Sequence, residues 1–231
     1  MRVIKSQPSL ADQVYEAIAD EICDGALPAG SHLIQEQLAE RLGVSRQPVQ
    51  QALVLLKADG MVEELGKRGL WVTPLDADLM RHHYDIRAAL DGLAARKAAI
   101  RVANSQHLGV SFSQKAEEIL ELGQDAVNTG DVSGQVRHDI ALHALIYDLS
   151  GNPLLSRTAE SHWRFLRRAM GEILRRAKLP NEIWRQHAEI VDAIASGDED
   201  LSFELMIEHD LGAAIKLGAV LKTSVAESVI P

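Results

Sequence analysis

Four side chains in the second half of the chain have the types and the spacing of a metal site. Asp139 and His143 lie four residues apart, so they share one face if this segment is a helix. His187 and His209 fall in the apolar stripes of two later helical segments. One carboxylate and three imidazoles form a set that suits a divalent ion, zinc or nickel in the first place and manganese or iron as further candidates.

This quartet is expected to face the protein interior, because apolar residues recur beside each member at helical spacing. Those neighbours are Val136, Ile140 and Ile146, then Ile183, Ile190, Val191 and Ile194, and finally Leu205, Met206 and Ala213. A buried polar group without a partner costs on the order of 1–3 kcal/mol, and one ion satisfies all four groups. Core histidines with ordinary hydrogen bonds are the alternative for any single residue. For four residues on three helices, a metal site is the better interpretation.

A second group of polar residues lies near the N-terminus, in the segment 38–53, LAERLGVSRQPVQQAL. The apolar spacing predicts two short helices; Gly43 can take the left-handed conformation that ends the first, and Ser45 can cap the second. A helix-turn-helix of this kind places its second helix in the major groove of DNA. The residues expected to face the DNA from this helix are Ser45, Arg46, Gln47, Gln50 and Gln51.

A β-hairpin is predicted directly after the second helix. The runs 61–65 and 70–73 are rich in β-forming residues, and they flank the tip 66–69, Gly-Lys-Arg-Gly. A basic tip beside a recognition helix suits contact with phosphates or with the minor groove. The predicted DNA-binding residues of this wing are Lys67, Arg68 and Gly69. A surface hairpin with solvated charges is the alternative.

The helix-turn-helix carries a recognisable signature. From Leu38 to Gly60 the chain matches LA..LGVSR.PV..AL..L...G, and it therefore resembles the GntR family of bacterial winged-helix regulators. In that family the arginine of the Ser-Arg pair, here Arg46, contacts bases, and the wing glycine, here Gly69, lets the tip approach the DNA. The family usually has Thr at Gln47 and Arg-Glu at residues 50 and 51. Because glutamine can form two hydrogen bonds with adenine, the operator is expected to differ from that of typical members.

Length and charge are those of a two-domain protein whose DNA contacts are local. The 231 residues divide into a predicted DNA-binding domain, 1–75, and a larger domain, 76–231. The net charge is −9, and the first part alone carries 7 basic and 10 acidic residues, which argues against DNA binding through overall charge. The single cysteine, Cys23, has no partner for an internal disulfide. Without a signal peptide or a long apolar run, a cytoplasmic protein that makes no membrane contact is expected.

Every periodic segment after residue 76 is helical. Turn sequences such as Ser-Gly-Asn-Pro at 150–153 separate six predicted helices. The helices cover 78–102, 106–128, 132–149, 153–176, 181–195 and 199–222. The predicted fold is therefore mainly α, with an N-terminal winged helix-turn-helix followed by an all-helical antiparallel bundle of six helices.

The helical part resembles the FCD effector domain of the same family over about residues 78–222. In that domain an aspartate and a histidine four residues apart are followed by histidines on the last two helices, which is the order of the quartet described above. The match includes the Ser-Gly-Asn turn at 150–152 and the Gly-Asp start of the last helix at 197–198. With six predicted helices rather than seven, the domain resembles that of the VanR-like branch of the FadR subfamily.

One further candidate comes from the first helix of this domain. Arg87 and Asp91 match the family's Arg-x-x-x-Glu pattern, in which the arginine commonly faces the effector cavity. The resemblance implies that Arg87 binds the carboxylate of a small organic acid through paired hydrogen bonds. A solvated ion pair between residues four apart is the alternative.

Other polar and aromatic residues receive ordinary interpretations. Trp163, Phe165 and Trp184 are expected in the core, and the histidines outside the quartet are expected at the surface or in structural roles. A solvated face is predicted on the fourth helix of the bundle, formed by Arg167, Arg168, Arg175 and Arg176.

Taken together, these interpretations predict a ligand-responsive transcriptional regulator, and most such proteins are repressors. A homodimer is expected to bind palindromic double-stranded operator DNA, and a small carboxylate at the metal-containing pocket is expected to change that binding. The alternative is a metal-dependent hydrolase or lyase in which the quartet activates water. No inward carboxylate beyond Asp139 is evident as a general base, and a winged helix has no use in such a reaction. The prediction is therefore that the chain is not an enzyme.

Overall fold

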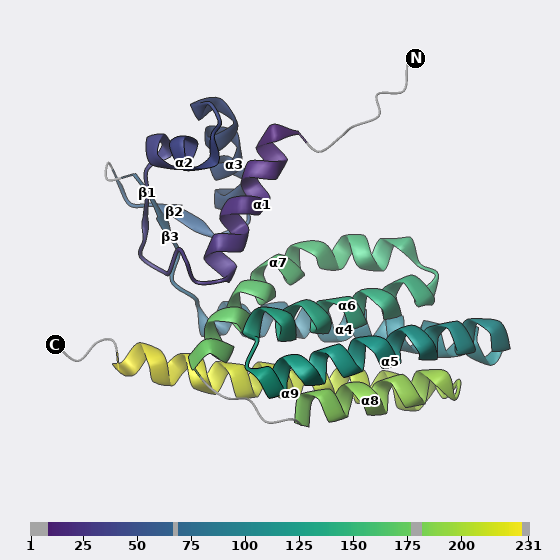
Figure 1. Cartoon of the computed structure of the whole chain (residues 1–231). Helices are drawn as coiled ribbons and strands as arrows, with labels where there is room; N and C mark the ends of the chain where they lie inside the picture. The colour runs from purple at the N-terminus through teal and green to yellow at the C-terminus, as the bar shows by residue number, and fades with distance from the viewer. Residues whose placement is uncertain (1–8, 67–68, 177–181, 228–231) are drawn as a thin grey trace, which may run out of the picture. The chain divides into compact units, whose positions relative to one another are not determined.

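The computed structural model describes residues 9–66, 69–176 and 182–227. The chain forms two compact units, residues 1–75 and 76–231, and each has its own core (Figure 1). In the described ranges, no helix combines the length and the apolar character that crossing a membrane requires.

Three helices make up most of the first unit: α1 (Leu10–Cys23), α2 (Gln35–Leu42) and α3 (Arg46–Ala58). Gly43 ends α2 in the left-handed conformation, with a φ of 64°. Ser45 is the N-cap residue of α3, but its side chain makes no capping hydrogen bond. Backbone bonds close the turn instead, from Gly43 to Glu40 at 3.2 Å and from Val44 to Ala39 at 3.0 Å. The predicted helix-turn-helix is thereby confirmed, although the predicted cap is absent.

α3 is amphipathic, and this determines which of its side chains remain outside. Its inward face holds Val49, Ala52, Leu53 and Leu56, which pack with the inward residues of α1 such as Ile18. Burying each of these larger side chains contributes about 1.5–3 kcal/mol. The rotation of α3 is therefore set by its apolar residues, and its polar residues are left facing solvent.

A small antiparallel sheet completes the first unit. β2 (Val62–Glu64) and β3 (Leu70–Val72) form the predicted hairpin, with Glu64 opposite Leu70. β1 (His32–Leu33) pairs with the other edge of β3, so the strand order is β1-β3-β2. β1 was not expected from the sequence, because two residues are too short to show an alternating pattern. Lys67 and Arg68 of the predicted wing tip lie outside the described residues.

The described part of the second unit consists of six long helices, as predicted. They are α4 (Ala77–Ala103), α5 (Gln106–Thr129), α6 (Val132–Ser150), α7 (Pro153–Arg176), α8 (Glu182–Ala195) and α9 (Glu199–Glu227). Asp76 caps α4 through hydrogen bonds from the backbone of Asp78 and Leu79, and Asp131 caps α6. Ser150 and Gly151 end α6 at the predicted turn.

The packing of α4 against α9 organises the second unit. Alanines and one glycine line the buried side of α4, and a Cβ at Gly92 would lie 2.9 Å from Ile207 of α9. This close approach needs a residue without a side chain. The helices that carry the quartet, α6, α8 and α9, all pack with α4, so the inward faces of α4 and of these helices enclose one interior.

Candidate metal centre and DNA-reading face

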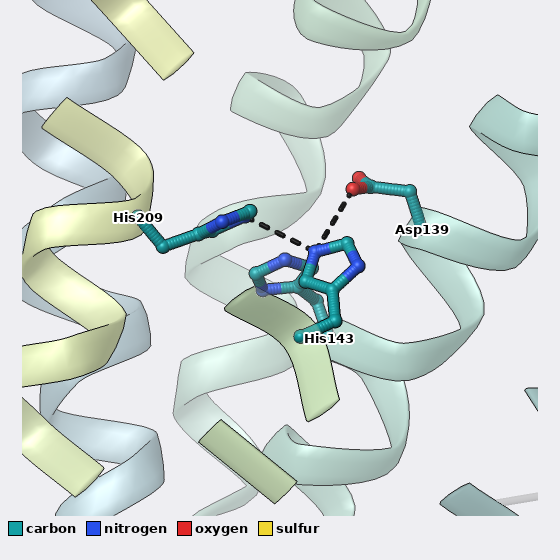
Figure 2. Close-up of side chains that lie close together, drawn as sticks. Asp139, His143 and His209 are labelled. Carbon is teal, nitrogen blue, oxygen red and sulfur yellow. Dashed lines mark hydrogen bonds and ion pairs between the residues drawn. The ribbon is translucent and has the colours of Figure 1, made fainter. Parts of the chain in front are cut away.

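The structure brings the four predicted metal ligands together. Asp139 and His143 lie on α6, His187 on α8 and His209 on α9, and their exposed fractions are between 0 and 8%. One ligand atom from each lies within 4.8 Å of the others. Nε2 of His187 is 3.3 Å from a carboxylate oxygen of Asp139 and 3.1 Å from Nε2 of His209. Figure 2 shows Asp139, His143 and His209 converging on one point.

Several polar atoms of this quartet are buried without a hydrogen-bond partner among the described residues. They are Oδ2 of Asp139, Nε2 of His143 and Nδ1 of His187. Buried polar atoms normally have hydrogen-bond partners. These unpartnered atoms therefore mark a place where a bound ion would supply the missing interactions. Three imidazole nitrogens and a carboxylate oxygen are the donors that zinc and nickel prefer. The residues present therefore fit a divalent ion.

The electrostatic state of the quartet also suits a cation. Burial opposes ionisation of Asp139, but the hydrogen bond and charge of His187, with His143 and Arg87, outweigh it and lower the pKa of Asp139 below its ordinary value. Burial lowers the pKa of His143, and the charge of Arg87 acts in the same direction. Burial, followed by the charges of His187 and His143, lowers the pKa of His209 well below its ordinary value. An ionised carboxylate and neutral imidazoles are the forms that bind metals.

Neighbouring side chains orient two of the histidines. Nδ1 of His209 is hydrogen bonded to Oε1 of Gln186 at 3.2 Å. Because that oxygen can only accept, Nδ1 carries the hydrogen and Nε2 of His209 offers its lone pair to the quartet. Nδ1 of His143 lies 2.9 Å from Oδ2 of Asp91 on α4, which favours the same arrangement for His143. Partners of this type set the ring orientation of metal-binding histidines.

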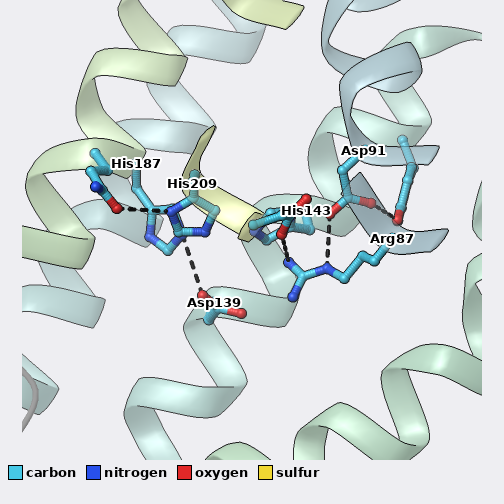
Figure 3. A network of polar contacts seen from close by, with 9 residues as sticks. Arg87, Asp91, Asp139, His143, His187 and His209 are labelled. Atoms are coloured by element: carbon cyan, nitrogen blue, oxygen red, sulfur yellow. Dashed lines mark hydrogen bonds and ion pairs between the residues drawn. The ribbon is translucent and has the colours of Figure 1, made fainter. Parts of the chain in front are cut away.

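Beside His143 lies a buried network of which the sequence indicated only Arg87 and Asp91 (Figure 3). Nε of Arg87 donates to Asp91 at 2.9 Å, an Nη atom of Arg87 is 3.4 Å from Asp210, and Tyr147 donates to Asp91. Arg87 also lies over the ring of Trp163, 3.7 Å from its centre. Arg87 and Asp91 are thus buried, and the alternative of a solvated ion pair is wrong.

Two carboxylates in this network correct an expectation. Asp91 and Asp210 both face the interior, so Asp139 is not the only inward acid of the second unit. Arg87 and His143 outweigh the effect of burial and hold the pKa of Asp91 below its ordinary value. Burial raises the pKa of Asp210 well above its ordinary value, although the charge of Arg87 opposes this. Asp210 follows His209 directly, and its stripe with Ala214, Leu217 and Leu221 was a signal that could have revealed it.

A cavity of about 50 Å³ opens beside the quartet. Asp139 and His209 line it together with Arg87, whose buried Nη2 forms an ion pair with Asp210 at 3.4 Å but no hydrogen bond. Tyr84, Gln135 and Lys216 add polar groups. The rest of the wall is mainly apolar and includes Val127, Val136, Met170, Leu174, Ile183 and Trp184. A small pocket with an apolar wall and a few convergent polar groups has the character of a ligand site.

The predicted DNA-facing residues of the first unit lie together on one exposed face. Ser45, Arg46, Gln47, Gln50 and Gln51 are all exposed on or beside the first turns of α3. The guanidinium of Arg46 pairs with Glu36 of α2 at 2.5 Å, and both side chains are largely exposed. Exposed pairs of this kind contribute little to stability, so Arg46 can exchange its partner at small cost.

The wing glycine has a structural requirement of its own. Gly69 has a φ of 97°, a conformation that other residues rarely adopt, and a Cβ there would lie 2.7 Å from His32. His32 in turn stacks on Trp71, with ring centres 4.6 Å apart. The close approach of the chain at Gly69 therefore depends on glycine.

The remaining expectations had mixed outcomes. Trp163, Phe165 and Trp184 are buried, as predicted. Arg168, by contrast, is buried, so the prediction that it lies on a solvated face is wrong, whereas Arg175 is exposed. The half-buried His83 forms a hydrogen bond with His162, 2.9 Å between their Nδ1 atoms, which is a structural role.

Two family models match the chain. The FCD domain matches residues 82–211, and the model described as "Bacterial regulatory proteins, gntR family" matches residues 10–72. The "HTH-type transcriptional repressor RspR" of Escherichia coli K12 is 24% identical over 197 residues, which are 85% of this chain and 84% of that protein. The "Probable D-xylose utilization operon transcriptional repressor" of Paenarthrobacter nicotinovorans is 29% identical over 210 residues, 88% of this chain and 87% of that protein.

Solved structures show the same fold. E. coli McbR/YncC is 23% identical, with a TM-score of 0.75 over 95% of this chain and 100% of that one. A GntR regulator from Rhodococcus sp. RHA1 is 21% identical, with a TM-score of 0.75 over 90% of this chain and 96% of that one. At these identities the likeness concerns the architecture.

Proposed function

The chain belongs to the gntR family of bacterial regulatory proteins and carries an FCD domain, so it is a DNA-binding transcriptional regulator, and we propose that it is a metal-dependent repressor controlled by a small carboxylate. The family and the relatives are regulators rather than enzymes, and the hydrolase or lyase alternative is therefore set aside. Under this proposal residues 1–75 read DNA and residues 76–231 bind the effector and dimerise.

The observation that carries the proposal is the buried quartet with its unpartnered polar atoms. Asp139, His143, His187 and His209 hold one divalent ion, zinc or nickel in the first place and manganese or iron in the second. When bound, the ion supplies a Lewis-acidic centre for an oxygen ligand. The quartet contributes the donors, and burial keeps competing water away from them.

The cavity beside the quartet supports the choice of a small organic acid as effector. Its volume of about 50 Å³ suits a small ligand, and its apolar wall favours a ligand with a short hydrocarbon part. Arg87 presents a buried Nη2 that forms an ion pair with Asp210 at 3.4 Å but no hydrogen bond, and Lys216, paired with Glu182 at 2.9 Å, adds a second cation. A carboxylate at this point pairs with positive charge that is already in place.

The first unit supports recognition of a specific operator. Arg46, Gln47, Gln50 and Gln51 are exposed on α3, with Ser45 at its start and Gly69 in the wing; Lys67 and Arg68 complete the proposed set. Arginine pairs with guanine and glutamine with adenine in the major groove. A palindromic operator requires two such helices related by a two-fold axis, so we propose a homodimer. The names of RspR and of the Paenarthrobacter relative favour repression over activation.

Operator release by an effector is the test of this function. The protein first selects its operator from a pool of random DNA duplexes, and its affinity for that operator is measured with zinc and after chelation. Mono- and dicarboxylic acids of two to six carbons are then added to the zinc-loaded complex. At least one acid should weaken binding to the operator, and the same acid should raise the melting temperature of the zinc-loaded protein only. Operator binding that no acid changes, with or without zinc, would contradict the proposal.

A further inference from the structure

One large apolar side chain stands exposed in the middle of the polar face of α3. Val54 has an exposed fraction of 63%, the highest among the large apolar side chains described in the first unit. It follows Gln47 by seven residues and Gln50 by four, so the three lie on the same side of the helix. At about 100° per residue, Val54 lies about 20° from Gln47 and about 40° from Gln50 around the helix axis. Val54 therefore belongs to the face that carries the proposed base-reading residues.

The core of the first unit fixes the direction in which Val54 points. Val49, Leu53 and Leu56 of α3 are at most 1% exposed, and they hold the helix in one rotation about its axis. Val54 lies on roughly the opposite side of the helix from these three residues. Its methyl groups therefore face away from the apolar core of the first unit, toward whatever the polar face of α3 binds.

The major groove of DNA offers one apolar group to a side chain in this position. Its base edges present hydrogen-bond donors and acceptors, with a single exception, the C5 methyl group of thymine. Arginine and glutamine bind the polar edges, whereas an apolar side chain is stabilised by contact with the methyl group, because that contact removes both from water. A valine among glutamines therefore matches the mixture of groups that an operator containing thymine presents.

The spacing of these residues also suits a helix that lies in the major groove. Such a helix can contact bases through side chains at positions i, i+3, i+4 and i+7. Gln47, Gln50, Gln51 and Val54 have this spacing, and Val54 is the one member that the proposed base-reading set leaves out. Leu55, the other exposed large apolar residue of α3, is 42% exposed and lies about 100° farther around the helix, outside this spacing.

We propose that Val54 is a specificity-determining residue, which selects a thymine in the operator through contact with its C5 methyl group. The inference rests on the proposed recognition of the operator by α3, and it adds one residue and one base. Val54 lies one turn, about 6 Å, beyond Gln50, and base pairs are 3.4 Å apart, so the thymine should lie within about two base pairs of the one that Gln50 contacts. In a palindromic operator it occurs once in each half-site.

Deoxyuridine tests this contact, because it differs from thymidine only in the missing methyl group and keeps the base pairing. Each thymine of the operator selected from random duplexes is replaced in turn, in both half-sites, and the dissociation constant is measured for the wild type and for Val54→Ala. At one thymine the wild type should bind ~4-fold more weakly per half-site, and ~15-fold more weakly when both half-sites are changed. Val54→Ala should not respond to that replacement. A wild type that no replacement affects, or a response of equal size in Val54→Ala, would overturn the inference.

Leu55→Ala is the matched control, since it removes an exposed apolar side chain from the same helix but outside the proposed face. This variant should keep the full response to deoxyuridine. Val54→Thr retains one methyl group that can contact the thymine, so it should keep part of the response. Melting temperature and zinc content should be those of the wild type in all three variants. A response that Leu55→Ala loses and Val54→Ala keeps would assign the methyl contact to Leu55 and overturn the inference.

Arg46→Ala separates the inference from the proposal on which it rests. If this variant binds the operator as the wild type does and no thymine methyl group matters, the α3 face does not read bases, and both are wrong. If Arg46→Ala weakens binding but the deoxyuridine response does not depend on residue 54, only the inference is wrong. Alanine favours helices and Val54 is exposed, so Val54→Ala should leave α3 intact and make either result informative.

Discussion

The polar face of α3 and the polar quartet between α6, α8 and α9 make opposite use of side chains of similar chemistry. On α3 the arginine and the glutamines are exposed, and their contacts in the free protein are weak surface pairs such as that of Arg46 with Glu36. In the quartet, the aspartate and the three histidines are buried, and several of their atoms have no partner among the described residues.

This difference determines how the function of each region can be recognised. An exposed polar residue does not lower the stability of the free protein, so its role can be recognised only from the motif to which it belongs. A buried unsatisfied atom costs on the order of 1–3 kcal/mol, so the burial of these atoms is itself the observation that supports the proposal of a bound ion. Changes to the quartet should therefore affect stability and metal binding together, whereas changes to the α3 face should affect DNA binding alone.

Removal of a metal ligand should have the largest effect. Zinc at about 1,000 times its dissociation constant adds about 4 kcal/mol to the stability of the folded state, which corresponds to a rise of about 8–16 °C in melting temperature for a chain of this size. His187→Ala and His209→Ala should abolish this rise and lose the bound ion in elemental analysis.

The matched control for these variants is His138→Ala. His138 precedes Asp139 on α6 but is half-exposed and is not part of the quartet. Its substitution should leave both the zinc content and the zinc-dependent rise in melting temperature as in the wild type. Two results together would contradict the metal site: a wild-type protein that contains no metal when purified without chelator, and a melting temperature that zinc and nickel do not change. The histidines of the quartet would then be core histidines with ordinary hydrogen bonds.

The α3 face is tested next, by Arg46→Ala. Loss of a base contact should weaken operator binding by about 1–3 kcal/mol per half-site, which is ~5- to 150-fold, while melting temperature and zinc content stay constant. Lys57→Ala, on the last turn of the same helix and paired with Glu64, is the matched removal of a positive charge. If both variants bind the operator equally well, Arg46 does not read bases.

The sequence was sufficient for the fold where the pattern is long and periodic. All six helices of the second unit lie within a residue of their predicted starts, because each has an apolar stripe and a turn sequence at its ends. The two-residue strand β1 was not predicted, since it depends on pairing with β3 and not on the local preference of its residues for strands. The burial of Arg168 and Asp210 was not predicted for a related reason. Charged side chains are expected to be exposed unless their partners on other helices are known.

The candidate site was predictable only in part, and the partners of its residues explain why. The four candidate ligands share helical stripes with apolar residues, so each could be assigned to an inward face. The contacts that orient them, Asp91 with His143 and Gln186 with His209, join different helices and become visible only after packing. The spacing along the sequence was thus sufficient to identify the candidate metal ligands. It was not sufficient to predict how their side chains are oriented.

Asp91→Asn should sharpen the comparison further, because it removes a charge that touches the quartet without being part of it. The amide holds His143 less firmly in the orientation that faces the ion, and zinc affinity should fall ~10- to 100-fold. Asp91→Glu keeps the carboxylate and should restore most of that affinity. Operator selectivity should not change in either variant. An unchanged zinc affinity in Asp91→Asn, measured by competition with a chelator, would show that Asp91 serves only as the partner of Arg87.

The smallest expected effect is that of pH, and it again separates the two regions. The pKa values of His143 and His209 lie below the ordinary value near 6.5, so these rings stay neutral in the folded protein while the unfolded chain already binds protons. The metal-free protein should therefore lose stability as pH falls below about 6.5. The zinc-dependent rise in melting temperature should persist at pH 6, because the folded ligands need not be deprotonated first. α3 carries no histidine or carboxylate, so the base preferences of the zinc-loaded protein should be the same at pH 6 and 7.5. Melting curves with and without zinc at both values, together with an operator selection at each, measure these outcomes. If the zinc effect disappears by pH 6, the quartet behaves like exposed histidines, and the contrast between a buried metal centre and an exposed reading face fails at its buried end.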